Sequence, residues 1–359
     1  MTTRRRVLAG LLASGLVPAA SWADAGSPAY LAAARRGDGR YILVGLTADG
    51  LPLFDLPLPA RGHAAAAHPK RPEAVAFARR PGRFALVLDC STGDLLARLD
   101  APTGRHFYGH GAFSADGTRL FTTENDYGAP RGMVGVWDAA RGYARVGEFS
   151  SGGTGPHDIL RLPGEETLVV ANGGIETHPD SGRAKLNLPA MRPNLSYLDP
   201  NGALVEQVAP DPALHMNSIR HLAVAPDGTV AIAFQWQGDP YDAPPLVALH
   251  RRGGELRYLQ APEPLHRQMQ GYGGSIALSG SQVAVTSPRG GILQLFELGQ
   301  GAFAGDHSLT DVCGVSPRAG GFLVTTGTGA VHGLSGGVLD PAGTHPLQWD
   351  NHLVGLVPA

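Results

Sequence analysis

Short stretches in which hydrophobic and polar residues alternate recur along the chain, and turns rich in glycine and aspartate separate them. In residues 107–128, FYGHGAFSADGTRLFTTENDYG, one such run ends at Asp116-Gly117 and a second run follows. A period of two is typical of β-strands with one buried face, and an Asp-Gly pair between two such runs indicates a β-hairpin. His110 opens this predicted hairpin. The polar residues that close its second strand are Glu124, Asn125 and Asp126.

The same hairpin pattern recurs in other parts of the chain. HDILRLPGEETLVVAN begins at His157 and HLAVAPDGTVAIAFQW begins at His221, each with a glycine seven positions after the histidine. Cys313 opens a run with the same spacing, Ser275 opens a shortened version and His63 opens a longer one. Self-similar units of this kind indicate a repeat architecture.

A seventh unit can be assembled from the two ends of the chain, because residues 352–356 and 41–56 also read as strands. Joining the ends closes the ring and leaves no exposed sheet edge, as in a propeller. If residues 1–23 are removed, 336 residues remain, or 48 for each of seven blades. Propeller repeats are roughly 40–50 residues long. We therefore expect an all-β, seven-bladed β-propeller closed by pairing of its N- and C-terminal strands; an open β-sandwich is the alternative.

The composition supports many short strands. Fifty glycines and 29 prolines in 359 residues leave little room for long helices. Only Cys90 and Cys313 are present, so disulfides cannot form the framework of the fold. No lysine- and arginine-rich stripe stands out, which argues against a nucleic-acid partner.

The N-terminus has the layout of an export signal. Arginines precede an apolar run, and Ser21 and Ala23 form a cleavage site of small residues. TRRRVL, residues 3–8, resembles the twin-arginine pattern; an ordinary secretory signal is the alternative. We expect residues 1–23 to be a twin-arginine signal peptide and residues 24–359 to be one propeller domain, a periplasmic monomer without stable membrane insertion. Cleavage after residue 23 would remove three of the 29 basic residues, so the mature chain would carry 26 basic and 31 acidic residues.

The hairpin geometry predicts that polar and ionisable side chains gather on one face of the disc. The Asp-Gly turns lie on one face, so the starts of the inner strands and the ends of the second strands lie on the other. The inner strands begin with His63, His110, His157, His221, Cys313 and His352. The neighbouring second strands end near Arg79, Glu124, Asn125, Asp126, Asn172, Glu176, Gln235 and Trp236.

Converging imidazoles and carboxylates suit a transition metal such as iron, zinc or copper. The expected ligands are His110, Glu124, His157, Glu176 and His221. The other residues expected on this binding face are His63, Arg79, Asn125, Asp126, Asn172, Arg220, Gln235, Trp236 and His352. Two alternatives stay open. Each histidine can instead bond within its own blade, as in WD-type propellers, or the face can capture a small anion with Arg79, Arg80, Arg220 and Arg289.

One repeat is longer than the others. The interval from His157 to His221 is 64 residues, and its extra segment, ETHPDSGRAKLNLPAMRPNLSYLD, follows the end of a second strand. We expect it on the binding face, where it can cover the channel mouth.

Several motifs together resemble a known family. GRHFYGHGAFSADGTRLFTTEND, GPHDIL, VVANGGIETHPDSGRAKLNLPAM, SIRHLAVAPDG and FQWQGD are similar to a bacterial family of twin-arginine-exported proteins of unknown function, related in outline to YVTN and WD propellers. The resemblance covers nearly the whole mature chain. Genes of that family often lie beside those of imelysin-type periplasmic iron-uptake proteins, so it implies partners in iron uptake. The matching motif positions are His110, Glu124, Asn125, Asp126, His157, Asn172, Glu176, Asn187, Met191, Arg220, His221, Gln235 and Trp236.

Three functions are compatible with this pattern. The first is a binding protein, accessory to iron or metal acquisition, with a histidine- and carboxylate-rich site at one channel mouth. The second is a propeller enzyme similar to lactonases or quinoprotein dehydrogenases that uses the same mouth. The third is a protein-interaction scaffold without a small-molecule site.

Overall fold

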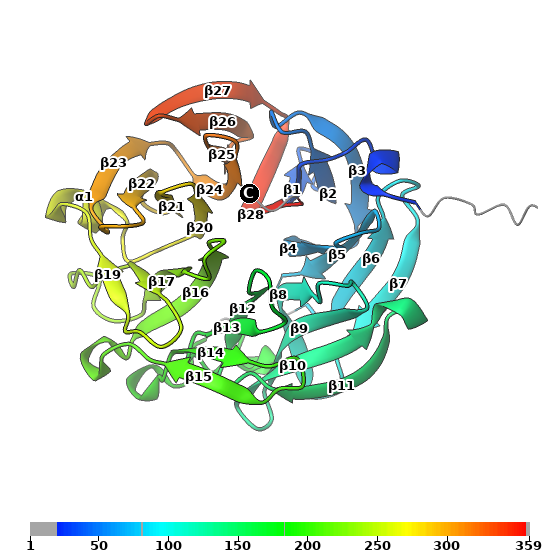
Figure 1. Ribbon diagram of the computed structural model, residues 1–359, viewed down its shortest axis with the longest axis horizontal. Coiled ribbons are helices and arrows are strands. Elements are labelled where there is room, and N and C mark those ends of the chain that lie inside the picture. Colours follow the sequence, from blue (N-terminus) through cyan, green and yellow to red (C-terminus); the bar gives the residue numbers. More distant parts are fainter. Residues whose placement is uncertain (1–19, 80–81, 183, 357–359) are drawn as a thin grey trace, which may run out of the picture.

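The computed structural model describes residues 20–79, 82–182 and 184–356. Seven four-stranded antiparallel sheets are arranged as blades around a central axis (Figure 1). This confirms the expected seven-bladed β-propeller. Residues 1–19, most of the predicted signal peptide, lie outside the described residues.

The strands of each blade are given from the axis outward. Blade one contains β28 (Leu347–Gly355), β1 (Tyr30–Arg36), β2 (Tyr41–Leu46) and β3 (Pro52–Leu58). Blade two contains β4 (Gly62–Ala67), β5 (Glu73–Ala78), β6 (Phe84–Asp89) and β7 (Leu95–Asp100). Blade three contains β8 (Arg105–Phe113), β9 (Arg119–Asp126), β10 (Arg131–Asp138) and β11 (Ala144–Ser150). Blade four contains β12 (Pro156–Arg161), β13 (Leu168–Asn172), β14 (Asn194–Leu198) and β15 (Leu204–Val208).

The remaining blades follow the same order. Blade five contains β16 (Asn217–Val224), β17 (Val230–Trp236), β18 (Val247–His250) and β19 (Arg257–Leu259). Blade six contains β20 (Ser275–Ser279), β21 (Gln282–Ser287), β22 (Ile292–Glu297) and β23 (Phe303–Ser308). Blade seven contains β24 (Val312–Arg318), β25 (Gly321–Thr326), β26 (Ala330–Ser335) and β27 (Val338–Thr344). The helical elements are α1 (Glu263–Gln268) and the 3-10 turns η1 (Trp22–Ala25), η2 (Ala139–Arg141), η3 (Pro179–Ser181), η4 (Leu188–Ala190) and η5 (Pro212–Leu214).

Blade one joins the two ends of the chain. β28 pairs with β1 in antiparallel register, with Leu353 opposite Ala32 and Val354 opposite Leu31. The sequence pattern correctly placed the C-terminal strand in this blade, and the structure adds β1 between it and β2. The closure therefore rests on a backbone ladder and a buried apolar face.

The blades pack through hydrophobic side chains on their facing surfaces. Phe77 of blade two and Phe107 of blade three are fully buried, with ring centroids 6.3 Å apart. Phe121 and Ile159 similarly belong to one cluster that joins blades three and four. Full burial of such a side chain contributes about 1.5–3 kcal/mol. This packing makes the ring of blades a rigid frame for the axis.

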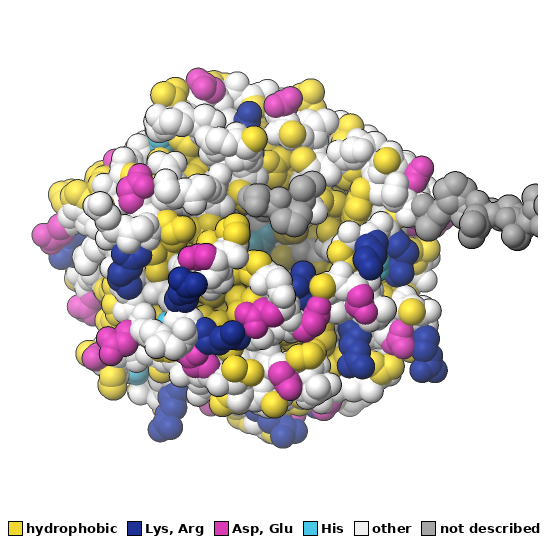
Figure 2. Space-filling view, viewed as in Figure 1, with side chains coloured by type: hydrophobic (Ala, Val, Ile, Leu, Met, Phe, Trp, Pro, Cys, Tyr) yellow, Lys and Arg dark blue, Asp and Glu magenta, His cyan; other side chains and the backbone are white. Residues whose placement is uncertain are grey.

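The seven inner strands, β28, β4, β8, β12, β16, β20 and β24, contact one another in a closed ring. They surround a hollow at the centre of the disc, where histidine is visible from the face drawn in Figure 2. Among the described residues, no helix is both long and apolar enough to cross a membrane.

Candidate metal centre in the central channel

Irregular pairing turns one histidine on each of five inner strands toward the axis, and in β8, β16 and β28 this histidine lies within the strand and does not open it. The register between β4 and β5 shifts between Gly62 and Ala65, which frees His63 from regular pairing. The shift between β12 and β13 lies between Pro156 and Asp158 and frees the intervening His157 in the same way. Similar shifts lie at or beside the histidines of β8, β16 and β28. Because a bulge bends the strand and redirects a side chain, each histidine reaches the channel instead of its own blade.

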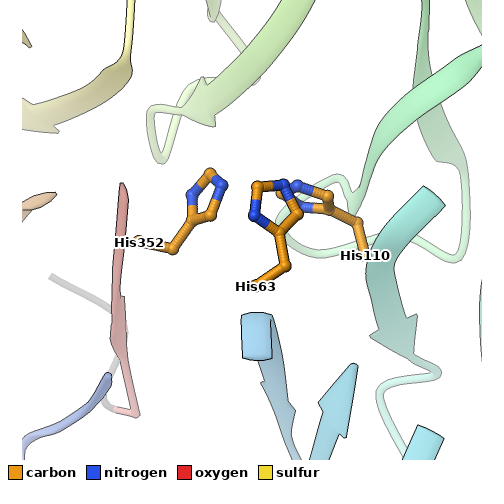
Figure 3. Close-up of side chains that lie close together, drawn as sticks. All are labelled: His63, His110 and His352. Atoms are coloured by element: carbon orange, nitrogen blue, oxygen red, sulfur yellow. The ribbon is translucent and has the colours of Figure 1, made fainter. Parts of the chain in front are cut away.

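Five histidines from five blades meet at the axis, and we call them the histidine cluster. Its members are His63, His110, His157, His221 and His352. The ring centroid of His352 lies 4.5 Å from the ring centroid of His63 and 4.6 Å from that of His110. Figure 3 shows these three rings turned toward one another. All five residues are at most 8% exposed.

Two overlapping groups within the cluster have the spacing of metal ligands. In one group, His63, His110 and His352 each offer a nitrogen, and these atoms lie within 4.8 Å of one another. The second group, His110, His157 and His221, meets the same limit. Zinc–imidazole bonds of about 2.0–2.1 Å put ligand nitrogens roughly 3–4 Å apart, so small ring rotations are enough to close either group on an ion. His110 belongs to both groups.

A carboxylate from the next blade orients His110. Nδ1 of His110 lies 3.0 Å from Oδ1 of Asp158. Asp158 is itself held by the backbone N–H groups of Ile159 and Leu222, which donate to it at 2.8 and 3.0 Å. Nε2 of His110 is buried and has no hydrogen-bond partner among the described residues. Histidines that bind a metal through one ring nitrogen commonly donate the other N–H to a carboxylate, and His110 has this arrangement.

Asp158 was not among the residues predicted from the sequence. It follows His157 directly, where the matching repeats have Gly111 and Leu222. That polar residue in an otherwise small or apolar position is the signal that could have identified it.

A second acidic residue that the sequence did not reveal lies beside His63. Oδ1 of Asp350 lies 3.9 Å from Nδ1 of His63, and Asp350 pairs with Arg61 at 2.6 Å and with Arg79 at 3.4 Å. Burial alone would raise the pKa of Asp350, but His63 and the two arginines outweigh burial and hold that pKa well below its ordinary value. Asp350 is therefore an anion at neutral pH that balances part of the local positive charge.

Burial keeps four imidazoles of the cluster, those of His63, His157, His221 and His352, in the neutral form. Burial lowers the pKa of His63 to about 4, although Asp350 partly opposes this effect. Burial also holds the pKa values of His157, His221 and His352 well below 6.5, with nearby cationic groups adding to the shift. A neutral imidazole has a lone pair available, so a metal ion has no proton to displace at neutral pH.

A cavity of about 180 Å³ adjoins the cluster. His63, His157 and His221 line it on one side. Four cationic side chains also line it, and they are Arg79, Lys185, Arg220 and Arg289. The uncharged lining residues are Tyr108, Ile175, Gln235, Trp236, Gln237, Tyr272 and Asn351. The predicted face residues Arg79, Arg220, Gln235 and Trp236 thus reach one common space, whereas Arg80 lies outside the described residues.

The long segment after β13 contributes to this cavity. Lys185, one of the lining residues, belongs to it, and Ile175, another, directly precedes it. Asn187 fixes the segment because its side chain accepts from the Glu176 N–H at 2.7 Å and donates to the Gly174 carbonyl at 2.9 Å.

Glu124 is placed away from the histidine cluster. It lies opposite Phe107 in the sheet, and its side chain points into blade three, where Arg145 of the outer strand donates to both of its oxygens at 2.7 and 2.9 Å. Thr122, two residues earlier on the same face of the strand, also donates to it at 3.0 Å. Neither histidine group includes Glu124 or Glu176. The carboxylates near the cluster are instead Asp158 and Asp350.

Three further predicted face residues have partners within the fold. Asn125 donates to the Thr177 carbonyl at 3.0 Å, and Asp126 pairs with Arg131 at 3.1 Å. Asn172 donates to the Ser151 carbonyl at 2.8 Å. These residues brace the loops around the channel mouth.

Cys313 occupies the inner-strand position that corresponds to the histidines, but it belongs to neither metal group. Its thiol donates toward the Thr325 carbonyl at 3.4 Å, and burial raises its pKa to about 12. Cys90 and Cys313 are both free thiols. The two cysteines therefore do not form a disulfide with each other.

Comparison with known proteins identifies a family and a fold. No curated protein matches the chain. The hydrazine synthase of Kuenenia stuttgartiensis has a similar fold, with a TM-score of 0.58 over 80% of this chain and 86% of that chain at 14% sequence identity. At this identity the likeness concerns the fold alone. A family described as a protein of unknown function, DUF1513, matches residues 56–356, which is nearly the whole propeller. The chain therefore belongs to the DUF1513 family.

Proposed function

We propose that this protein is a metal-binding β-propeller that holds a divalent transition-metal ion in its histidine cluster. The observation that carries the proposal is the pair of overlapping three-histidine groups, each with its ligand nitrogens within 4.8 Å. Neutral imidazole favours copper, zinc, nickel and iron(II), whereas magnesium and calcium prefer oxygen ligands. His110 is the central ligand because it is shared by both groups and oriented by Asp158.

The proposal is tested by loading chelator-treated protein with Zn²⁺, Cu²⁺, Ni²⁺ or Fe²⁺ and measuring bound metal after gel filtration. We expect one ion per chain for at least one of these metals, and loss of that ion in His110→Ala. His307→Ala is the matched control, because His307 lies on the outermost strand of blade six. Equal retention by both variants, or no retention by the unmodified protein, contradicts the proposal.

The place of action is part of the same proposal. The arginines and apolar run of residues 3–23 support export by the twin-arginine route, which carries folded proteins into the periplasm. Export of a reporter fused to residues 1–30, and its loss when Arg4 and Arg5 are changed to lysine, tests this point. We do not extend the proposal to iron acquisition, because imidazole ligands do not by themselves distinguish iron from copper or zinc.

A further inference from the structure

The cavity beside the histidine cluster has a one-sided charge. Its four charged lining residues apart from histidine are all cationic, and no carboxylate lines it among the residues that the structure describes. The whole chain carries 29 basic and 31 acidic residues, so this excess of positive charge is a local feature.

The cations reach the cavity from four different blades. Arg79 follows β5 in blade two, and Arg220 belongs to β16 in blade five. Lys185 belongs to the long segment of blade four, and Arg289 follows β21 in blade six. Side chains from such distant parts of the sequence meet only because the blades close into a ring.

Local contacts hold these side chains at the cavity wall. The Arg289 guanidinium lies over the ring of Tyr272, 4.5 Å from its centroid. Arg79 lies 3.4 Å from Asp350, which compensates part of its charge from behind the lining. Next to Arg220, the position of Gly173 leaves room for the guanidinium, since a Cβ there would lie 3.3 Å from its Nη1 atom.

Buried ring nitrogens of the histidine cluster are a second indication that the cavity holds a ligand. Nδ1 of His63, of His157 and of His221 has no hydrogen-bond partner among the described residues, and all three residues line the cavity. They are 6%, 7% and 3% exposed. Buried polar groups are normally satisfied, so unpartnered ones at a cavity wall point to a bound species.

A divalent ion bound in the histidine cluster would further favour an anion in the cavity. Imidazole is an uncharged ligand, so it would leave both positive charges of the ion uncompensated near the cationic side chains that line the cavity. Like charges held close together repel one another unless an anion offsets them. An anion in the cavity offsets the charge of the lining residues and of the ion together.

We propose that this cavity binds a small oxyanion, with two or more negative charges on carboxylate or phosphate groups, and that the anion accompanies the metal ion into the site. The first part concerns the metal-free protein; the second rests on the proposed function. Arginine and lysine supply charge-assisted hydrogen bonds to such oxygens. The rings of Tyr108, Trp236 and Tyr272 add apolar walls that suit the carbon skeleton of an organic acid. The volume of about 180 Å³ admits a small molecule and excludes a folded partner.

The test begins with calorimetric titration of metal-free protein with citrate and, separately, with inorganic phosphate. We expect binding of at least one of them at one site per chain, weakened roughly tenfold in Arg220→Gln, in Arg289→Gln and in Lys185→Gln, since each variant loses one charged donor. Lys185 is exposed, so its replacement leaves the fold intact. Arg119→Gln is the control, because Arg119 is exposed at the turn end of its hairpin. Binding of citrate alone identifies an organic acid, and binding of phosphate identifies a phosphate-bearing ligand.

The metal is then titrated with and without the anion. We expect tighter metal binding when the anion is present, and loss of that gain in Arg220→Gln. No binding of either anion, or equal weakening in Arg119→Gln and the cavity variants, overturns the inference. If the anion binds but no metal does, the proposed function fails and the anion site stands. If the metal binds and the anion does not change its affinity, the proposed function stands and the coupling between anion and metal fails.

Discussion

The Nδ1 atom of His110, on the inner strand of blade three, lies 3.0 Å from Oδ1 of Asp158, on the inner strand of blade four. This contact crosses a blade boundary and fixes which nitrogen of His110 faces the centre of the cluster. A carboxylate partner typically contributes a factor of about 10–100 to metal affinity.

We therefore expect Asp158→Asn to weaken metal binding by about 10–100-fold without removing the ligand itself. The asparagine keeps one of the two oxygens and so accepts from one of the two backbone N–H groups, but it loses the charge that orients His110. Competition with a chelator of known affinity measures the change. An affinity equal to that of the unmodified protein would show that Asp158 only supports the backbone.

Glu124 is expected to be important for stability and not for metal binding. It is fully buried and paired with Arg145, so Glu124→Gln removes one of two carboxylates that the Arg145 guanidinium contacts and leaves it with Glu148, 2.9 Å away. The expected loss is about 1–3 kcal/mol in the free energy of unfolding, measured by urea denaturation, because charge-assisted hydrogen bonds to a buried carboxylate are replaced by weaker ones. Metal content per folded chain stays unchanged. Glu255→Gln, at an exposed position, is the control and should change neither quantity.

Gly109 is expected to affect both stability and the site. Its φ angle is +100°, and a Cβ there would lie 2.6 Å from Cδ2 of His63. Gly109→Ala therefore costs about 1–2 kcal/mol of backbone strain and displaces the His63 ring.

Gly104→Ala provides the matched control for that variant, since Gly104 has a φ angle of +82° and no atom near its absent Cβ. It should show the backbone cost with unchanged metal affinity. Equal metal affinity in both variants would mean that the His63 ring position does not influence the site.

Glu148 supplies a pH-dependent part of the stability of blade three. The ion pair with Arg105 is the main cause of its lowered pKa, about 2, and Arg145 adds to the effect against the opposing influence of burial. Because the folded-state pKa lies below the ordinary value of 4.5, the stabilisation is complete above about pH 4.5 and is lost as the pH falls toward 2.

The difference in urea midpoint between the unmodified protein and Glu148→Gln tests this prediction. It should be largest at pH 6 and shrink as the pH is lowered from 4.5. A constant difference across that range would mean that the charge of Glu148 does not contribute.

The fold could be read from local pattern because strand alternation and turn chemistry are local properties. His110, His157 and His221 each stand seven residues before a glycine, and that spacing makes them structurally equivalent whatever their long-range contacts. Equivalence in a ring of blades is sufficient to bring them to one level of the channel. The seven-bladed closure followed from the same counting.

Side-chain direction could not be read in this way, because it depends on pairing register and on the neighbouring blade. The register shifts beside His63 and His157 turn those rings toward the axis, and no pattern of residues in the sequence predicts these shifts. Glu124 resembles a ligand in the sequence, yet the pleat of β9 turns it toward Arg145 on the outer strand. Asp158 is the partner of His110 only because blades three and four, which follow one another along the chain, pack side by side.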